Sequence, residues 1–170
     1  MDVVVREAGL LDVGAIAQVQ VSSWRAAYRG VVPDAFLDNM DIDERAERWR
    51  EGITDRPGGQ ITYVAQLDQV AAGFGAVGAC RDSGATGVGE LYAIYVSPEY
   101  WRRGIGRALH AACLDALGGQ GYDGARLWVL EANPQARAFY ERFDWRWDGT
   151  TESHAFGDEQ LPIVRYGRRL

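Results

Sequence analysis

The chain has 170 residues, of which 47% are hydrophobic, 11% aromatic and 25% charged. This length and composition predict one folded domain over residues 1–170 and exclude a disordered chain. The formal net charge of −6 argues against general nucleic-acid binding and is compatible with a cationic acceptor.

The cysteines and the hydropathy of the chain indicate in which cellular compartment the protein is expected. Cys80 lies in a strand-like run and Cys113 on an apolar helix face, so core positions fit them better than a disulfide, a redox pair or a metal site. No apolar run reaches membrane-spanning length and no signal peptide precedes the folded part. We therefore expect a cytoplasmic protein with no metal and no membrane partner.

Periodicity predicts one strand and three helical stretches in the first third of the chain. The strand covers residues 2–6. Asp12 is expected to cap a helix whose apolar face includes Ile16, Val19 and Trp24. A glycine break then separates this helix from helical stretches at residues 33–40 and 43–52.

The remaining elements alternate between strands and helices. Residues 61–67 and 70–80 read as a hairpin that turns at Asp68-Gln69, and residues 90–96 read as a further strand. A helix at 104–117 and a strand at 125–130 follow. A helix capped by Asn133, with Pro134 at its first position, precedes two final strands at 146–154 and 161–168.

The loop before the helix at 104 has the composition of an anion site. Its sequence is WRRGIGR, from Trp101 to Arg107. Glycine permits close backbone approach, arginine binds phosphate oxygens, and a helix N-terminus presents free N–H groups to an anion. A kinase-type phosphate loop is excluded because the chain has no lysine, and the connection from Val96 is too long for a dinucleotide-binding turn. From this loop alone, an ordinary helix start is an equally good interpretation.

A second segment favours the ligand site. It reads EANPQARAFYERFDW, from Glu131 to Trp145. Together the two segments resemble the coenzyme A site of the GCN5-related N-acetyltransferase (GNAT) family. There a Gln/Arg-x-x-Gly-x-Gly/Ala loop wraps the pyrophosphate and an Asn…Ala…Phe-Tyr helix flanks the pantetheine arm. This chain departs from the pattern at Trp101, where Gln or Arg is usual, and at Asp144, where Gly is frequent.

The resemblance implies a fold as well as a ligand. It implies the order β-α-α-β-β-β-α-β-α-β-β and a single α/β (α+β) domain. Its mixed, mostly antiparallel and twisted sheet of about seven strands carries helices on both faces. Acetyl-CoA is the implied co-substrate, and the residues implied to bind it are Ile94, Tyr95, Val96, Arg102, Arg103, Gly104, Ile105, Gly106, Arg107, Asn133, Ala136, Phe139 and Tyr140.

The implied reaction is direct attack of a free amine on the thioester in a ternary complex. A bulge in the strand at 90–96 would free N–H groups near Ile94 and Val96 for the pantetheine and the oxyanion. Tyr140 is the candidate general acid for the departing thiolate, since a phenol and a thiol have comparable pKa values of roughly 10 and 8.5. Without this context a half-buried helical tyrosine would be the better interpretation.

The general base is harder to assign. Glu90 begins the strand at 90–96, where the family often places a carboxylate, although a solvent-exposed glutamate at a strand edge is an equal alternative. His110 is expected to face away from the thioester. His154, near a turn, is a lesser candidate for the acceptor site.

Acceptor recognition is expected in the N-terminal helices. Trp24 and Tyr28 are four residues apart and could flank an entry channel, although core packing suits Trp24 better. The run from Ser22 to Gly30 is similar to a subgroup that includes bacterial polyamine acetyltransferases. The acidic residues near it, which would suit a polyamine, are Asp34, Asp38, Asp41 and Glu44.

Three functions stay open from the sequence. The leading one is N-acetylation of a small-molecule amine such as a polyamine, an amino compound or an amine antibiotic. The same chemistry on a protein N-terminus or lysine is the second, and a non-catalytic acyl-CoA-binding module is the third. A homodimer is also possible, with Trp145 and Trp147 either at its interface or closing the core.

Overall fold

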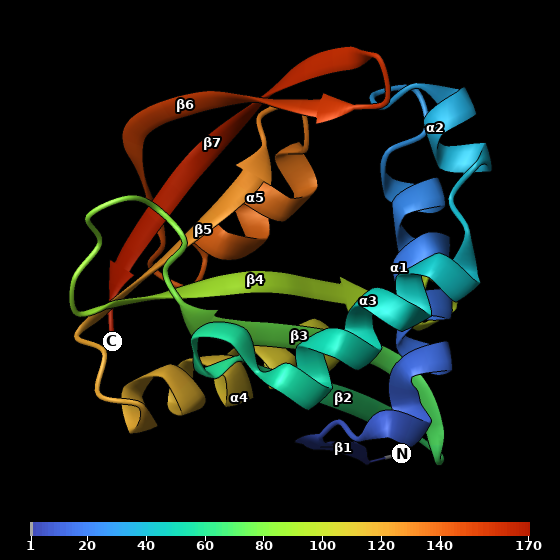
Figure 1. Ribbon diagram of the computed structural model, residues 1–170, viewed down its shortest axis with the longest axis horizontal. Helices are drawn as coiled ribbons and strands as arrows, with labels where there is room; N and C mark the ends of the chain where they lie inside the picture. Colours follow the sequence, from blue (N-terminus) through green and yellow to red (C-terminus); the bar gives the residue numbers. More distant parts are fainter. Residues whose placement is uncertain (1) are drawn as a thin grey trace.

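The computed structural model describes residues 2–170. Five helices and seven strands follow one another in the chain (Figure 1). The helices are α1 (Val13–Ala27), α2 (Asp34–Asp38), α3 (Ile42–Asp55), α4 (Ile105–Gly119) and α5 (Pro134–Glu141). The strands are β1 (Val3–Glu7), β2 (Ile61–Leu67), β3 (Val70–Ala79), β4 (Val88–Val96), β5 (Gly124–Leu130), β6 (Arg146–Phe156) and β7 (Glu159–Arg169).

All seven strands form one sheet in the order β1-β2-β3-β4-β5-β7-β6. Only β4 and β5 run parallel; the other neighbours are antiparallel. The mixed sheet with helices on both faces confirms the predicted fold class. The structure has one helix more than the order that the resemblance implies. The additional helix is α2, which lies within the helical stretch predicted at residues 33–40.

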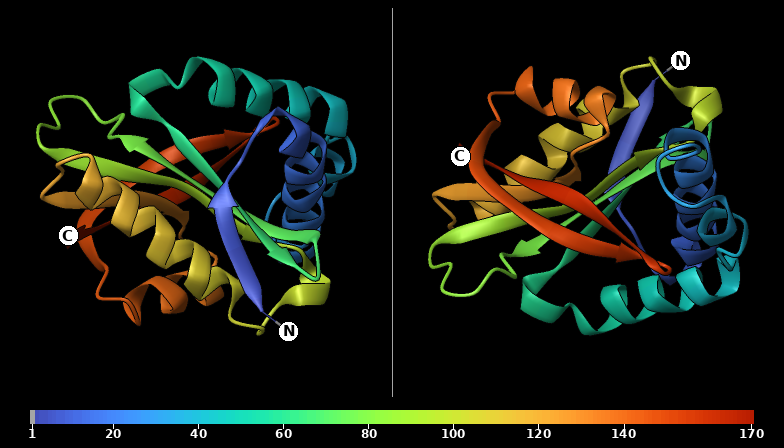
Figure 2. Two further views of the ribbon diagram at one scale, coloured as in Figure 1. Left: turned by 90° about the horizontal axis from the view of Figure 1, so that it is seen from below. Right: turned by 90° about the horizontal axis from the view of Figure 1, so that it is seen from above.

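The two faces of the sheet carry different helices. Figure 2 shows α1 and α3 on one side and α4 and α5 on the other. Ile16 and Val19 of α1 pack on Val64 and Phe74 of the sheet, while on the opposite face Leu109 of α4 packs in a cluster that includes Ala65, Leu67 and Ala72. Burial of this apolar surface on both faces supplies the main driving force for folding.

Close approach of α4 depends on two glycines of β3. A Cβ at Gly73 would lie 3.1 Å from side-chain atoms of Ile105 and Leu109 in α4, and one at Gly75 would lie 2.8 Å from Sγ of Cys113 in the same helix. The first distance is tighter than most real Cβ contacts and the second is shorter than real side chains allow, so these glycines set how near the helix lies to the sheet.

Most predicted boundaries agree with the structure to within a few residues. The β2–β3 hairpin turns where expected, with φ of 50° at Asp68 and 69° at Gln69, as a type I′ turn requires. Asp12 occupies the N-cap position of α1 as predicted, but its side chain does not cap the helix: the carboxylate accepts from the Gly9 amide and pairs with Arg6, and it makes no bond to the first turn of α1. The cap of α3 is Asp41, whose side chain accepts from the amide of Glu44.

The two aromatic residues considered for a dimer interface have different environments. Trp145 is completely buried and belongs to the core under β5 and β7, so an interface role for it is ruled out. Trp147 is 50% exposed on the edge strand β6. Both cysteines are free; Cys113 is a core residue as expected, whereas Cys80 is only half-buried. No helix within residues 2–170 is long and apolar enough to cross a membrane.

Candidate functional site

Strands β4 and β5 separate at the centre of the sheet. They pair only at Val88–Gly124, Gly89–Ala125 and Glu90–Arg126, although both strands continue well beyond (Figure 1). On its other side β4 carries a bulge, because Leu91 and Ala93 oppose adjacent residues of β3 and Tyr92 has no partner. A bulge bends a strand, so backbone groups of the last part of β4 face a gap instead of β5.

The N-terminus of α4 lies at the end of β4 and offers a row of free donors. The six consecutive backbone N–H groups from Arg102 to Arg107 donate no hydrogen bond to any acceptor within residues 2–170. The first hydrogen bond of the helix is donated by the Ala108 amide to the Gly104 carbonyl, at 3.0 Å. Arg102 and Gly104 adopt left-handed conformations, with φ of 63° and 82°. Successive N–H groups in such a turn form a concave anion site, to which the helix dipole adds. This donor set fits a pyrophosphate.

Trp101, the unusual residue of the loop, braces this site. Its indole Nε1 donates to the Val96 carbonyl at 2.7 Å, and the Ser23 hydroxyl donates to the same oxygen at 2.8 Å. The last residue of β4 is thereby tied to both the loop and α1. The departure at Trp101 therefore leaves the backbone donors in place.

Helix α5 forms the other wall of the gap. A Cβ at Gly106 would lie 3.5 Å from the Phe139 ring and 3.9 Å from a Val96 methyl group, so α4, α5 and β4 meet there. Asn133 caps α5, since its Oδ1 accepts from the Ala136 amide at 3.1 Å. The second departure from the family pattern, Asp144, keeps a left-handed turn after α5 with φ of 62°.

The side chains predicted for cofactor binding divide between two faces. Ile94 and Val96, both partly exposed, pack against the cluster that contains Ile105 of α4. Tyr95 points to the opposite face, where its ring lies 6.0 Å from that of Trp24.

Three tyrosines from different elements come close together beside the gap. Burial raises the pKa of the Tyr140 phenol, and Tyr95 and Cys113 add to this. Burial also raises the pKa of Tyr28, with further contributions from Tyr95 and Tyr140, while Asn133 acts in the opposite direction. The Tyr140 hydroxyl donates and accepts no hydrogen bond within residues 2–170, so it remains available to a ligand.

Glu90 is not a solvent-exposed residue at a strand edge: only 1% of it is exposed. Its carboxylate accepts from Nη2 of Arg81 at 2.6 Å and from the Arg81 amide at 2.8 Å. The Arg81 guanidinium lies 4.5 Å from the centre of the Tyr92 ring. A base at Glu90 would therefore have to act past Arg81 or through water.

His110 is also removed from the reaction. It is buried between α4 and α5, and its Nε2 accepts from the Trp145 indole at 2.9 Å. Its ring stacks on Phe143 at 4.5 Å.

A hollow of about 710 Å³ lies on the α1 and α3 side of the sheet, beside Tyr95. It contains Trp24, one of the two residues predicted to bind the acceptor, whereas Tyr28 lies behind Trp24 with ring centres 5.1 Å apart. His154 also lines it, next to Phe156. Sequence reasoning missed the other residues of its wall, because only the tertiary arrangement brings them together: Gln20, Trp49, Pro57, Gly58, Gln60, Ala79, Cys80, Arg81, Tyr92 and Ala93.

The acidic residues noted for a polyamine are engaged elsewhere. Asp34 and Asp38 pair with Arg29 at 3.2 and 2.9 Å. Asp41 caps α3 and Glu44 pairs with Arg48. None of the four lines the hollow, so they give no support to a polycationic acceptor. Within residues 2–170 no cluster of His, Cys, Asp or Glu is suited to a metal ion.

Comparison with known proteins agrees with this geometry. The Acetyltransferase (GNAT) family profile matches residues 21–145. The uncharacterised N-acetyltransferase YuaI of Bacillus subtilis is 35% identical over 142 residues, which cover 83% of this chain and 79% of that protein.

Two further similarities cover different shares of the chain. The mycothiol acetyltransferase of Beutenbergia cavernae is 45% identical over 53 residues, which cover 31% of this chain and 18% of that protein. The crystal structure of the PaiA N-acetyltransferase from Thermoplasma acidophilum in complex with coenzyme A superposes with a TM-score of 0.79 at 19% identity, over 100% of both chains. This last similarity is one of fold.

Proposed function

Because the chain belongs to the GNAT acetyltransferase family, we propose that it transfers the acetyl group of acetyl-CoA to a primary amine of a small molecule. The candidate acceptors are polyamines, amino compounds and amine antibiotics. The observation that supports a cofactor site most directly is the separation of β4 from β5 next to six free N–H groups at the start of α4.

On the cofactor side, backbone donors would do most of the binding. The N–H groups from Arg102 to Arg107 would hold the pyrophosphate, with the arginine side chains as additional cations. N–H groups of β4 between Ile94 and Val96 would hold the pantetheine and stabilise the oxyanion of the tetrahedral intermediate. Asn133, Ala136 and Phe139 would flank the arm from α5.

Tyr140 is proposed to assist the leaving group. Its raised pKa keeps the phenol protonated at neutral pH, so it is always ready to donate. The same shift makes complete proton transfer to the thiolate less favourable than two matched pKa values would. We therefore assign Tyr140 a hydrogen bond that strengthens as negative charge develops on sulfur.

The attacking amine must lose a proton before or during attack. Glu90 can take it only through a water molecule, since Arg81 occupies its carboxylate. His154 faces the hollow directly and is the alternative acceptor of that proton. The aromatic hollow beside Tyr95 is the proposed acceptor site, with Trp24 as one wall.

The test is release of CoA thiol from acetyl-CoA with amino acids, polyamines, aminoglycosides and short peptides, against a blank without acceptor. Acceptor-dependent release with a small amine is the expected result. Release with peptides alone would move the activity to a protein N-terminus or lysine. Binding of acetyl-CoA without release for any acceptor would instead support a binding module and overturn the proposal.

A further inference from the structure

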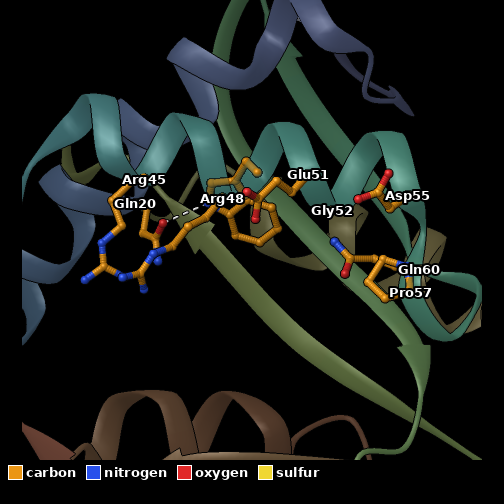
Figure 3. A pocket seen from close by; sticks show the side chains of 9 residues that line it. Gln20, Arg45, Arg48, Glu51, Gly52, Asp55, Pro57 and Gln60 are labelled. Atoms are coloured by element: carbon orange, nitrogen blue, oxygen red, sulfur yellow. Dashed lines mark hydrogen bonds between the residues drawn. The ribbon is translucent and has the colours of Figure 1, made fainter.

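The hollow beside Tyr95 continues into a second one along α3. This second hollow, of about 400 Å³, shares Gln20, Trp49, Pro57 and Gln60 with the first. Figure 3 shows Arg45, Gln20 and Arg48 at one end of it and Asp55 at the other. The two hollows therefore adjoin along these four residues, and together they are called the groove; its cationic end lies on the α1 and α3 side of the sheet.

Arg45 at this end has no direct ionic partner among residues 2–170. Within residues 2–170 its guanidinium makes no ion pair and donates no hydrogen bond, and it lies 5.6 Å from the centre of the Trp24 ring. Burial, and secondly the charge of Arg48, lower the pKa of Arg45, and the charge of Glu44 only partly offsets them. A half-buried cation that no carboxylate contacts directly is costly to keep, so its position fits a site where a ligand brings a closer negative charge.

Arg45 differs in this respect from the other arginines of the described chain. Its neighbours on α3 are paired, Arg48 with Glu44 and Arg50 with Glu47. Within residues 2–170, the other arginines whose side chains make no ion pair or hydrogen bond are exposed: Arg102, Arg103, Arg107, Arg142 and Arg169. Three of those five belong to the proposed pyrophosphate site.

Gln20 supplies a second donor at the same end. It is buried, with 7% exposed, and its Oε1 accepts from the Trp49 indole at 2.8 Å. Because a glutamine amide nitrogen can only donate, the oxygen must accept from the indole, and the amide nitrogen is the group left over. This Nε2 donates no hydrogen bond within residues 2–170, and Gln20 lines both hollows.

We propose that the acceptor amine also carries a carboxylate, which Arg45 and Gln20 bind while Trp24 and Tyr95 hold the rest of the molecule. Amino carboxylic acids are therefore the preferred acceptor class, ahead of polyamines. This inference rests on the proposed acetyl transfer to a small amine. It identifies Arg45 as a specificity-determining residue that makes no contact with the thioester.

The test compares acceptors that differ only in the carboxylate. Each amino acid that is acetylated is assayed beside its carboxamide and its decarboxylated amine, for example lysine, lysinamide and cadaverine. The variants are Arg45→Gln, which removes the charge; Arg45→Lys, which keeps it; and Arg50→Gln, a control on the same helix outside the groove.

The expected result is a preference for the carboxylate form that depends on Arg45. In Arg45→Gln, KM for the amino acid should rise about 10- to 100-fold with little change in kcat. KM for the carboxamide and the decarboxylated amine should stay constant, Arg45→Lys should recover part of the affinity, and Arg50→Gln should match the parent protein.

Two results would overturn the inference and leave the proposed function intact. One is turnover of the decarboxylated amines equal to that of the amino acids. The other is an equal effect of Arg45→Gln on all three acceptors. Absence of turnover with every amine, in the presence of acetyl-CoA binding, would instead overturn the proposed function and the inference with it.

Discussion

Trp145 donates its indole N–H to Nε2 of His110 across 2.9 Å, and both side chains are buried. A ring nitrogen that accepts a hydrogen bond cannot take up a proton without losing that bond. Burial, and secondly the charge of Arg168, lower the pKa of His110 to about 4. The imidazole is therefore neutral in the folded protein at any pH near 7.

This pair predicts a loss of stability in mild acid. In the unfolded chain the pKa of His110 returns to about 6.5, so the unfolded state binds a proton that the folded state does not. The contribution of neutral His110 to the free energy of unfolding is complete above pH 6.5 and is lost as the pH falls towards 4. It amounts to up to about 3 kcal/mol. Urea unfolding at a series of pH values between about 7 and about 5 should show about 2 kcal/mol of this loss, and the remainder develops as the pH approaches 4.

The control for this prediction is His110→Gln. Glutamine does not titrate, and its side-chain oxygen can still accept from Trp145. The free energy of unfolding of this variant should change much less across the same pH range. An unchanged slope would show that other groups cause the acid sensitivity.

Trp101 gives a second prediction, about the brace between the loop and β4. Trp101→Phe removes the hydrogen bond to the Val96 carbonyl but leaves the one from Ser23. We expect a loss of about 1 kcal/mol in the free energy of unfolding and a several-fold higher KM for acetyl-CoA. Chemical denaturation and initial-rate kinetics check the two effects.

Trp147→Phe is the matched control for Trp101. Its indole donates to the Thr150 carbonyl at an exposed position on β6, away from the cofactor loop. We expect no change in KM for acetyl-CoA. Equal effects of the two substitutions would argue against a role of the Trp101 brace in cofactor binding.

The two glycines of the loop are predicted to respond differently to alanine. Gly104 has φ of 82°, so Gly104→Ala should cost about 1 kcal/mol of stability and distort the anion site. At Gly106 a Cβ would make ordinary contacts with Phe139 and Val96, so Gly106→Ala should be close to neutral. Calorimetric titration with CoA should show a weaker affinity for the first variant only. The reverse order would contradict the assignment of the turn.

The turn and the helix cap at the proposed cofactor site could be predicted from the sequence because they are made by local chain geometry. The Arg102–Gly106 loop and the cap at Asn133 depend on a few neighbouring residues, and each carries a recognisable pattern. The hairpin turn at Asp68 and the alternation of strands and helices are local in the same sense.

Apart from Trp24 and His154, the wall of the hollow proposed for the acceptor could not be predicted, because it depends on tertiary contacts that no local pattern shows. Arg81 occupies the Glu90 carboxylate across nine residues, and Trp49 bonds to Gln20 across 29. Pairing of Asp34 and Asp38 with Arg29 is likewise invisible in a count of acidic residues. The Asp12 side chain does not cap α1 because Arg6 of β1, six residues earlier, pairs with its carboxylate.

Tyr140→Phe separates catalysis from folding. The hydroxyl has no protein partner within residues 2–170, so its removal should change the free energy of unfolding by no more than about 0.5 kcal/mol. If the phenol donates to the departing thiolate, kcat should fall about 100-fold while the affinity for acetyl-CoA changes little. Single-turnover kinetics and calorimetry with acetyl-CoA measure the two quantities.

Tyr166→Phe is the control for Tyr140→Phe, because it removes a hydroxyl that is bonded within the protein. The Tyr166 hydroxyl donates to Glu141 at 2.8 Å and accepts from Arg137 at 2.9 Å, in the core below β5. Its loss should cost about 2 kcal/mol of stability and leave kcat near that of the parent protein below the unfolding temperature. Unchanged turnover in Tyr140→Phe would remove Tyr140 from the mechanism. Equal losses of kcat in both variants would show that the effect of Tyr140 is structural. A catalytic phenol is expected to lower kcat in Tyr140→Phe without lowering the free energy of unfolding, whereas Tyr166→Phe lowers stability alone.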